Sequence, residues 1–310
     1  MTMRLAILCP GQGSQGPGMF DLGAGDPAAI AGVEAWLRDA QGPVARSALH
    51  ALLAHPSAMF DNRCAQPLVV ASTLMVWRLL AGRLPRPAMV AGYSVGEVSA
   101  YAVAGALPVD RAVTLASQRA AIMSEAAAHG GEQGMAAVSG IASPLAYELV
   151  AQAGCEAAID TPGALVAGGL RARLDKLALL APQAGAGYKP LPITVASHTS
   201  LLASAVDPLR KLLQAHAASP TLPLLAGVSA TTLHDGAEAA ELLARQTANT
   251  IRWTECLDAI AEARIDVALE LGPGNALARM LRERHPQIAC RSVADFRSVK
   301  GIVSWVEAQA

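Results

Sequence analysis

The sequence has little charge and no run of basic residues. Only 16% of its 310 residues are charged, 53% are hydrophobic, and the formal net charge at pH 7 is -1. Proteins that bind nucleic acid or an anionic membrane electrostatically show a basic stripe or a Lys/Arg run, and neither occurs in this sequence. This absence argues against nucleic acid or a membrane as the main partner.

Long apolar runs and paired cysteines are also missing. The one apolar run near the start, Leu5 to Cys9, is too short for a signal-peptide core or a membrane span. The five cysteines are odd in number and show no C-x-x-C spacing, which is typical of reduced thiols and not of a disulfide framework or a zinc site. We expect a cytoplasmic protein with no metal and no permanently bound cofactor.

A Gly-x-Ser-x-Gly motif is the most informative feature that is present. Gly92-Tyr93-Ser94-Val95-Gly96 follows a short apolar stretch typical of a buried strand, and Glu97 to Ala104 have the composition of a helix start. In this context the motif predicts a nucleophile elbow, whose glycines allow a sharp turn that exposes the serine hydroxyl at the sheet edge. The helix N-terminus then faces the negative charge that develops there.

Strand and helix patterns alternate along most of the chain. The first elements expected are a strand at 4–9 and helices at 27–38, 66–80 and 109–128. Gly- and Pro-rich loops separate them, which is typical of a layered domain. The fold class expected is α/β, with a large α/β-hydrolase-like domain. The same pattern resumes late in the chain with helices at 201–217 and 237–246 and strands at 222–227 and 267–271.

The middle of the chain has a different character. The elements predicted there are, in order, strand 135–139, helix 143–153, strands 156–160 and 164–167, helix 171–180 and strand 191–195. The order β-α-β-β-α-β is that of a ferredoxin-like unit. We therefore expect an inserted ferredoxin-like small domain at 130–193, and a large α/β domain formed by 1–129 and 194–310.

A serine nucleophile needs a base, and His198 is the candidate. It follows a predicted strand where the chain returns to the large domain, and strand C-termini in α/β sheets gather ligand-binding residues. A loop histidine that caps the next helix explains the same position equally well. A hydrolase of this fold also needs an acid between the serine and the histidine. Asp110, Asp160 and Asp175 lie in that interval, and none is well placed.

Five motifs occur in the order and spacing of malonyl-CoA:acyl-carrier-protein transacylases, a family that the chain resembles from about residue 4 to residue 280. The motifs are Pro10-Gly11-Gln12-Gly13-Ser14-Gln15, the elbow with Glu97, Gln118-Arg119, Ser197-His198 and Glu270-Leu271-Gly272-Pro273-Gly274. The resemblance implies a large domain with a ferredoxin-like insert, malonyl-CoA as substrate and an acyl carrier protein as partner.

The resemblance also implies a role for each matching residue. Ser94 would attack the thioester of malonyl-CoA, and His198 would be the general base that returns the proton to the leaving thiol. In this family a carbonyl group orients the histidine in place of an aspartate, and Gln246 matches the glutamine found near it. The backbone N–H groups of Gln12 and Val95 would form the oxyanion hole.

Arg119 is expected to select the substrate. The resemblance assigns it to the carboxylate of the malonyl group, which a guanidinium can hold through two parallel hydrogen bonds. The ordinary alternative is an exposed helix arginine, and we expect Arg111 to be one.

Three positions depart from the family's usual pattern. Tyr93, expected to line the pocket, stands where members of fatty acid synthesis usually carry histidine. Asp160 replaces a usual asparagine, and 224–228 lack the common asparagine pair. The elbow with Tyr93 is more similar to that of the malonyl transferase (epsilon) subunit of malonate decarboxylase, which charges a dedicated carrier subunit. We take that subunit as the main interpretation and the transacylase of fatty acid synthesis as the alternative.

Functions of other classes stay open at this point. A serine hydrolase or thioesterase uses water in place of the carrier thiol, and a non-catalytic carrier-binding module has kept only the fold. Lys189 and the pair Arg282 and Arg284 are candidate contacts for an acidic carrier. Selectivity between malonyl and methylmalonyl groups is also open, because one methylene changes binding by only about 1–3 kcal/mol in an apolar pocket.

Overall fold

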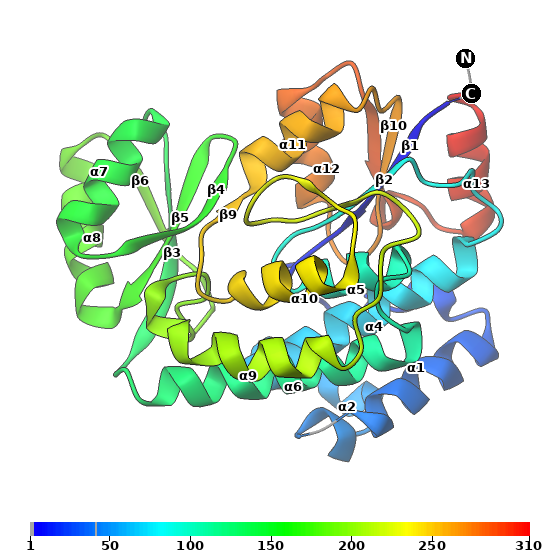
Figure 1. The fold of residues 1–310 in the computed structure, drawn as a ribbon, viewed down its shortest axis with the longest axis horizontal. Coiled ribbons are helices and arrows are strands. Elements are labelled where there is room, and N and C mark those ends of the chain that lie inside the picture. The colour runs from blue at the N-terminus through cyan, green and yellow to red at the C-terminus, as the bar shows by residue number, and fades with distance from the viewer. Residues whose placement is uncertain (1–2, 41) are drawn as a thin grey trace.

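The protein folds around two β-sheets of different size (Figure 1). The structure is a computed structural model that describes residues 3–40 and 42–310. Within these residues the larger sheet has six strands, in the spatial order β11 (Ala289–Ser292), β10 (Val267–Glu270), β1 (Leu5–Cys9), β2 (Met89–Gly92), β7 (Leu224–Leu225) and β8 (Thr232–Leu233). The smaller sheet has five, in the order β6 (Gly187–Pro190), β3 (Gln133–Ser139), β5 (Ala164–Leu170), β4 (Glu156–Thr161) and β9 (Ile251–Arg252).

Helices lie on both faces of the larger sheet and along one side of the smaller sheet (Figure 1). The α-helices described are α1 (Pro27–Asp39), α2 (Leu49–Ala54), α3 (Pro56–Phe60), α4 (Asn62–Leu80), α5 (Gly96–Val103), α6 (Val109–Ala128), α7 (Ser143–Ala153), α8 (Arg171–Gln183), α9 (Ala203–Gln214), α10 (Gly236–Arg245), α11 (Trp253–Glu262), α12 (Ala276–Arg284) and α13 (Val299–Glu307). Short 3₁₀ turns lie at Asp21–Gly23, Val44–Arg46, Ser200–Leu202 and Val293–Asp295. No helix among the described residues is long and apolar enough to cross a membrane.

The central strand β1 shows why the larger sheet is covered on both faces. All five of its residues are apolar and buried, as expected for a parallel strand between two helix layers. Side chains alternate along a strand, so Leu5, Ile7 and Cys9 pack into the core that contains α4 and α5. Ala6 and Leu8 pack into the opposite core, which contains α11 and α12. The expected large α/β domain is therefore confirmed.

The smaller sheet contains the expected β-α-β-β-α-β order, as β3-α7-β4-β5-α8-β6. Its strands pair antiparallel, and α7 and α8 pack with it around a core of its own. The fifth strand, β9, comes from far along the chain and pairs parallel with β4. The boundaries at 130 and 193 stay a prediction, because β9 adds a strand from outside that interval.

The prediction of a last strand at 191–195 in the small unit is wrong. The strand that closes the sheet is β6, and the chain leaves the ladder after the backbone bond from Leu191 to Met135. Pro192 has no N–H to continue the ladder. Leu191 and Ile193 instead line a pocket beside Ser94, so their apolar character serves the pocket and not the sheet.

Two later elements are shorter than expected. Helix 201–217 is a 3₁₀ turn at Ser200–Leu202 followed by α9, and strand 222–227 is reduced to the two residues of β7. The helices α2, α3, α11, α12 and α13 were not expected from the sequence. These helices are 5 to 10 residues long, so each spans few turns over which a periodicity can be recognised.

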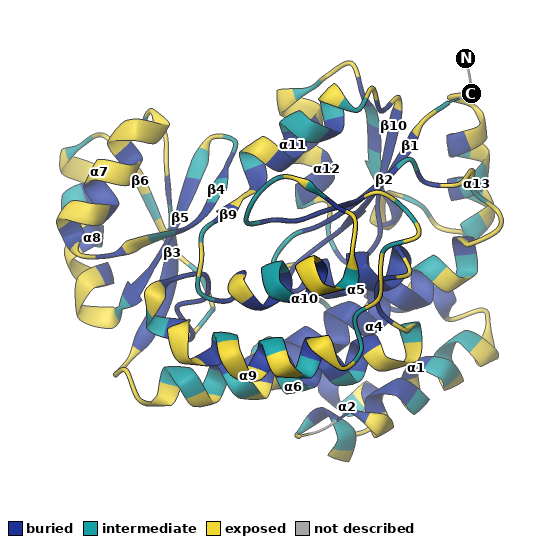
Figure 2. Ribbon diagram, in the orientation of Figure 1, coloured by how far each residue is buried: buried dark blue, intermediate teal, exposed yellow. Residues whose placement is uncertain are grey.

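Helix α5 is buried along its whole length (Figure 2). All of its residues from Gly96 to Val103 are buried, although it includes Glu97, Ser99 and Tyr101. A helix buried on every side must satisfy its polar side chains within the protein. Glu97, at the start of this helix, accepts two hydrogen bonds, and Tyr101, near its end, donates to the main-chain oxygen of Ala239 at 3.0 Å.

Glu270 at the end of β10 gives a pH-dependent contribution to stability. Burial raises the pKa of its carboxyl from 4.5 to about 7, while Oε2 accepts the N–H of Ala278 at 2.8 Å. The unfolded chain releases this proton near 4.5, so the free energy of unfolding falls as the pH rises from 4.5 to 7. The Glu270→Gln variant lacks this titration. We expect the change in the free energy of unfolding caused by the substitution to be more favourable at pH 8 than at pH 5, by roughly 2 kcal/mol, as measured by urea unfolding. An equal effect of the substitution at both pH values would contradict this.

Candidate active site

The elbow predicted from Gly92 to Gly96 is present between β2 and α5. Ser94 has φ 55°, in the left-handed region that side chains rarely adopt. Both glycines are required by packing, since a Cβ on Gly92 would lie 2.4 Å from Glu97 Cα. A Cβ on Gly96 would lie 2.2 Å from the carbonyl oxygen of Cys9. The turn therefore packs directly onto the end of β1 and lifts Ser94 above the sheet edge.

Ser94 and His198 meet although 104 residues separate them. Ser94 Oγ lies 2.8 Å from His198 Nε2, and His198 Nδ1 lies 2.6 Å from the main-chain oxygen of Gln246. A carbonyl only accepts, so Nδ1 carries the proton and Nε2 is free to accept the serine hydroxyl. His198 has φ 65°, and its N–H donates to Thr247 O at 2.8 Å. The arrangement provides a base in the correct tautomer.

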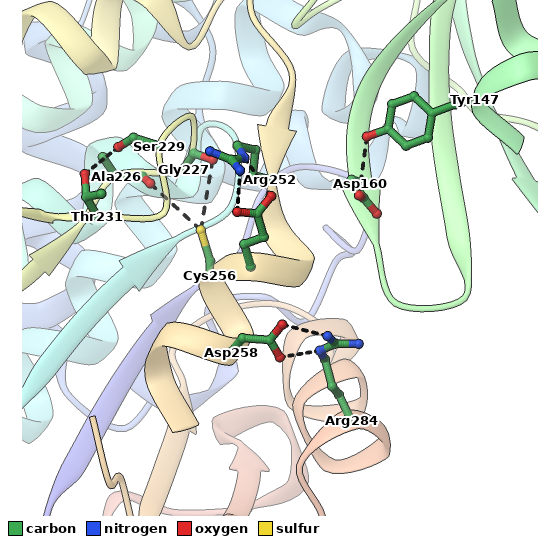
Figure 3. Close-up of polar contacts among 11 residues, drawn as sticks. Tyr147, Asp160, Ala226, Gly227, Ser229, Thr231, Arg252, Cys256, Asp258 and Arg284 are labelled. Carbon is green, nitrogen blue, oxygen red and sulfur yellow. Dashed lines mark hydrogen bonds and ion pairs between the residues drawn. The ribbon is translucent and has the colours of Figure 1, made fainter. Parts of the chain in front are cut away.

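No carboxylate orients this histidine. Of the three aspartates between Ser94 and His198, Asp160 accepts from Tyr147 at 3.3 Å and from Thr254 at 3.1 Å, on the outer side of β4 (Figure 3). A main-chain carbonyl takes the place of the acid, as the family resemblance implied. Within the described chain, no group of three His, Cys, Asp or Glu residues is arranged as a metal site.

The buried position of His198 shifts its protonation far from the usual range. Burial lowers its pKa from 6.5 to about 3, and the positive charge of Arg119 acts in the same direction. The imidazole is therefore neutral at pH 5 and above. We expect kcat/KM for acylation to lack an acidic limb near pH 6.5, as measured by stopped-flow acylation between pH 4 and 9.

The control for this profile is Arg119→Ala, which removes one of the two causes of the shift. With acetyl-CoA as substrate, the acidic limb of this variant should move to a higher pH than that of the unaltered protein. A limb near 6.5 in the unaltered protein would contradict the prediction.

The two expected oxyanion donors come from two segments: Val95 follows Ser94 in the elbow, and Gln12 lies in the loop after β1. Val95 is the N-cap of α5, so its N–H points from the positive end of the helix. The loop of Gln12 approaches closely because residue 11 is glycine, whose Cβ would lie 2.7 Å from Tyr93 O. Among the described residues, neither the Val95 N–H nor the Gln12 N–H donates to another group of the chain. Their role as oxyanion donors stays a prediction.

Arg119 is buried on α6 and lines the same pocket as Ser94. Nη1 donates to Gln66 Oε1 at 2.7 Å, and Nη2 donates to Gln246 Oε1 at 2.9 Å. Its Nε has no partner, and no carboxylate of the described chain lies within ion-pair distance of the guanidinium. Burial lowers its pKa to about 10, so it stays cationic at neutral pH. The cation is held by two neutral amides, and its charge is left for an anion.

The pocket is small and mostly apolar. Its volume is about 70 Å³, and Tyr93, expected there, lies at its wall with its ring 5.3 Å from that of Trp253, edge to face. The apolar wall comes largely from the small sheet and the segment after it: Met135, Ile159, Val166, Leu191 and Ile193. The pocket thus combines a nucleophile, a base and a buried cation within a narrow apolar space.

Two polar residues at the site had no role in the sequence analysis. Gln66 on α4 holds Arg119, and its Nε2 donates to Asn62 Oδ1 at 2.8 Å, one helical turn before it. Glu97 accepts from Gln246 Nε2 at 2.6 Å. The sequence offered only a weak signal for Glu97, because an acidic residue in the first turn of a helix is also favoured by the helix dipole.

Residues 7–301 match a family model described as an acyl transferase domain. The malonyl CoA-acyl carrier protein transacylase of Mycobacterium tuberculosis (strain ATCC 25618 / H37Rv) is 33% identical over 298 residues, covering 93% of this chain and 96% of that protein. The solved malonyl CoA-acyl carrier protein transacylase of Coxiella burnetii has a TM-score of 0.89 and 26% identity, covering 99% of this chain and 98% of that one.

A second solved structure is a malonyl-transacylase in complex with a type II PKS acyl-carrier protein. It has a TM-score of 0.89 and 26% identity, covering 97% of this chain and 99% of that one. The elbow, the serine–histidine pair and the two-sheet fold agree with these similarities over nearly the whole chain. This chain therefore belongs to the acyl transferase domain family and is an acyltransferase.

Proposed function

We propose that this protein moves a malonyl group from malonyl-CoA to the phosphopantetheine-type thiol of an acyl carrier protein, through an acyl group on Ser94. The observation that carries the proposal is one pocket that holds both the Ser94–His198 pair and the buried cation of Arg119. The names of the similar proteins, malonyl CoA-acyl carrier protein transacylases, support the same substrate and partner.

The first half-reaction acylates the serine. His198 Nε2 takes the hydroxyl proton as Ser94 Oγ attacks the thioester carbonyl of malonyl-CoA. The N–H groups of Val95 and Gln12 would stabilise the oxyanion, typically by about 3 kcal/mol for each donor. The C–S bond then breaks, and the imidazolium of His198 protonates the leaving CoA thiolate.

The second half-reaction runs in the opposite sense with a different thiol. His198 takes the proton of the carrier thiol as its sulfur attacks the acyl-Ser94 carbonyl, and the ester C–O bond breaks. The proton returns to Ser94 Oγ, so no water and no oxidant is consumed. Arg119 would hold the malonyl carboxylate during both halves, because an anion inside an apolar pocket needs a cationic partner.

The pathway is the finer part of the proposal. The relatives are named as acyl carrier protein transacylases, so they favour the fatty-acid-synthesis alternative over the malonate decarboxylase subunit that the elbow suggested. One similar structure includes a type II PKS acyl-carrier protein with its transacylase, which supports a carrier as partner. We therefore propose a carrier of the fatty acid or polyketide type, and the assay compares it with the malonate decarboxylase carrier.

Of the basic residues expected to contact an acidic carrier, two are already engaged. Arg284 donates to both oxygens of Asp258, at 2.5 and 2.6 Å (Figure 3). Arg282 donates to Cys290 O at 2.8 Å. Lys189 on the edge strand β6 is exposed, and its ammonium group forms no hydrogen bond or ion pair among the described residues. Lys189 is therefore the better candidate for a carrier contact.

The test is the intact mass of the protein after brief mixing with malonyl-CoA, acetyl-CoA or methylmalonyl-CoA. We expect a malonyl adduct on Ser94 that is discharged onto a holo carrier, with little adduct from acetyl-CoA. An adduct that is lost equally fast without carrier would support the thioesterase. If no adduct forms with any of the three, the protein is a non-catalytic module and the proposal fails.

A further inference from the structure

Glu97 is a fully buried carboxylate that lies behind the pocket and not in its wall. It is the second residue of α5, three residues after Ser94. Its Oε2 accepts two hydrogen bonds, from Gln246 Nε2 at 2.6 Å and from Gly227 N–H at 3.2 Å. No cation of the described chain lies within ion-pair distance of it, although the charge of Arg119 acts on it from farther away, and burial raises its pKa to about 7. A carboxylate buried without a cationic partner is costly, so its partners indicate what it does.

The side-chain amide of Gln246 can take two orientations, and its neighbours select one. Nε2 donates both of its hydrogens, to Glu97 Oε2 at 2.6 Å and to the main-chain oxygen of Ser94 at 3.0 Å. The main-chain oxygen can only accept, and Glu97 Oε2 is the acceptor in both of its hydrogen bonds. With the amide reversed, its oxygen would face two acceptors, and its NH₂ group would face the guanidinium. The carboxylate therefore keeps Gln246 Oε1 directed at Arg119.

Arg119 depends on the orientation of two amides, and each is set by a different neighbour. Asn62 sets the orientation of the Gln66 amide by accepting a hydrogen bond from its Nε2. Asn62 is itself oriented by its Nδ2, which donates to the main-chain oxygen of Ala120 at 3.1 Å. The Gln246 amide is fixed from Glu97. Neutral oxygens contact the guanidinium directly, and the Glu97 charge acts on it only from beyond ion-pair distance, so the guanidinium can still pair with an anionic acyl group.

The backbone around Glu97 is shaped to admit the carboxylate. A Cβ on Gly227 would lie 2.7 Å from Glu97 Oε2, so only glycine brings its N–H this close. The loop of Gly227 is held from the other side by Arg252 N–H, which donates to Gly227 O at 2.8 Å. Cys256 Sγ also contacts the oxygens of Ala226 and Gly227 at 3.9 and 4.0 Å (Figure 3).

We propose that Glu97 is a positioning residue for acyl-group selectivity, which acts through the Gln246 amide to aim Arg119 at the carboxylate of the acyl group. This inference rests on the proposed function. The inference adds to that function a residue that touches neither the substrate nor the side chain of the nucleophile. It assigns the choice of acyl group to Glu97, Gln246 and Arg119, and the chemical steps to Ser94 and His198. The main-chain oxygen of Gln246 serves His198 whichever way its side chain points.

The test compares two substitutions at one position. Glu97→Met removes the acceptor at similar volume, and we expect the ratio of kcat/KM for malonyl-CoA to that for acetyl-CoA to fall about tenfold to a hundredfold. KM for malonyl-CoA should rise, with a smaller change in kcat. Glu97→Gln keeps one acceptor oxygen for Gln246, so its ratio should stay within about threefold of the unaltered protein.

Glu270→Met and Glu270→Gln form the matched control pair. Glu270 is equally buried, accepts a backbone N–H and likewise has one oxygen without a partner, but it contacts no residue that lines the pocket through a hydrogen bond. Its substitutions should change stability and leave the malonyl-to-acetyl ratio unaltered. A purely structural role for Glu97 predicts the same behaviour for both positions.

Two further measurements keep the inference testable if Glu97→Met does not fold. Gly227→Ala retains the carboxylate and displaces it, so the ratio should fall, by less than in Glu97→Met. In an Arg119→Ala background, Gly227→Ala should leave the ratio unchanged, because the residue through which Glu97 acts is gone.

The outcomes separate this inference from the proposed function. If the unaltered protein forms no malonyl-Ser94, the proposed function fails before any variant is made. If it does, an unchanged ratio in both Glu97→Met and Gly227→Ala overturns the inference alone. An equal loss in Glu97→Gln and Glu97→Met would also overturn it, because the acceptor would then not be the cause.

Discussion

Ser94→Ala is expected to lower malonyl transfer by about ten-thousand-fold or more and to abolish the acyl adduct in intact mass spectra. The reason is geometric: within 2.8 Å of His198 Nε2 lies one hydroxyl, held there by the left-handed turn of the elbow. Alanine removes the atom that carries the acyl group and leaves the oxyanion donors and Arg119 in place. Binding of malonyl-CoA should therefore persist while turnover is lost.

Ser99→Ala is the matched control for this substitution. Ser99 lies on the same helix that follows the elbow, is fully buried, and its hydroxyl has no partner in the described chain. Ser99→Ala also removes a serine hydroxyl from this part of the chain, but it leaves the nucleophile Ser94 in place. Transfer within a few fold of the unaltered rate is expected. A surviving acyl adduct in Ser94→Ala would show that another residue is acylated.

Arg119→Ala is expected to reverse the preference for malonyl over acetyl groups. Loss of hydrogen bonds from a cation to a carboxylate costs about 1.5–3 kcal/mol each, so two of them correspond to a fall of roughly a hundredfold or more in kcat/KM for malonyl-CoA. Acetyl-CoA has no carboxylate, so its rate should be retained or raised, since removal of the cation also raises the pKa of His198. The measurement is kcat/KM for both thioesters.

Two other substitutions sharpen this prediction. Arg111→Ala removes an exposed guanidinium from the same helix and should leave the ratio unaltered. Arg119→Lys should recover only part of the malonyl rate, because an ammonium cannot contact Gln66 and Gln246 in the planar geometry that a guanidinium allows. An unchanged ratio in Arg119→Ala would remove the residue from substrate selection.

Local sequence signals predicted the elbow because its causes are local. The two glycines, the apolar strand before them and the helix start after them all lie within one short segment. The β-α-β-β-α-β order was also readable, since each element carries its own periodicity. The strand expected at 191–195 was not there, because its apolar side chains line the pocket and Pro192 interrupts the ladder. Apolar content alone does not say which surface a segment faces.

The contacts that tune the site could not be read from the sequence. Arg119 meets Gln66 from 53 residues away and Gln246 from 127 residues away, and no spacing rule joins them. His198 was selected through the family resemblance as much as its position, since it follows no strand and has a left-handed backbone. The side chain of Gln246 reaches Ser94, Glu97 and Arg119, whereas the sequence suggested only a place near the histidine.

The pairing of β9 with β4 limits how this enzyme can be rebuilt. Ile159 and Asp160 of the small unit align with Ile251 and Arg252, which lead directly into α11 and the core of the larger sheet. The small unit therefore cannot be exchanged by replacing only the segment between the two points where the chain enters and leaves it. A chimera that imports the small unit of a relative, to change the acyl pocket, must import β9 with it, or the new sheet will present an unmatched edge beside the pocket.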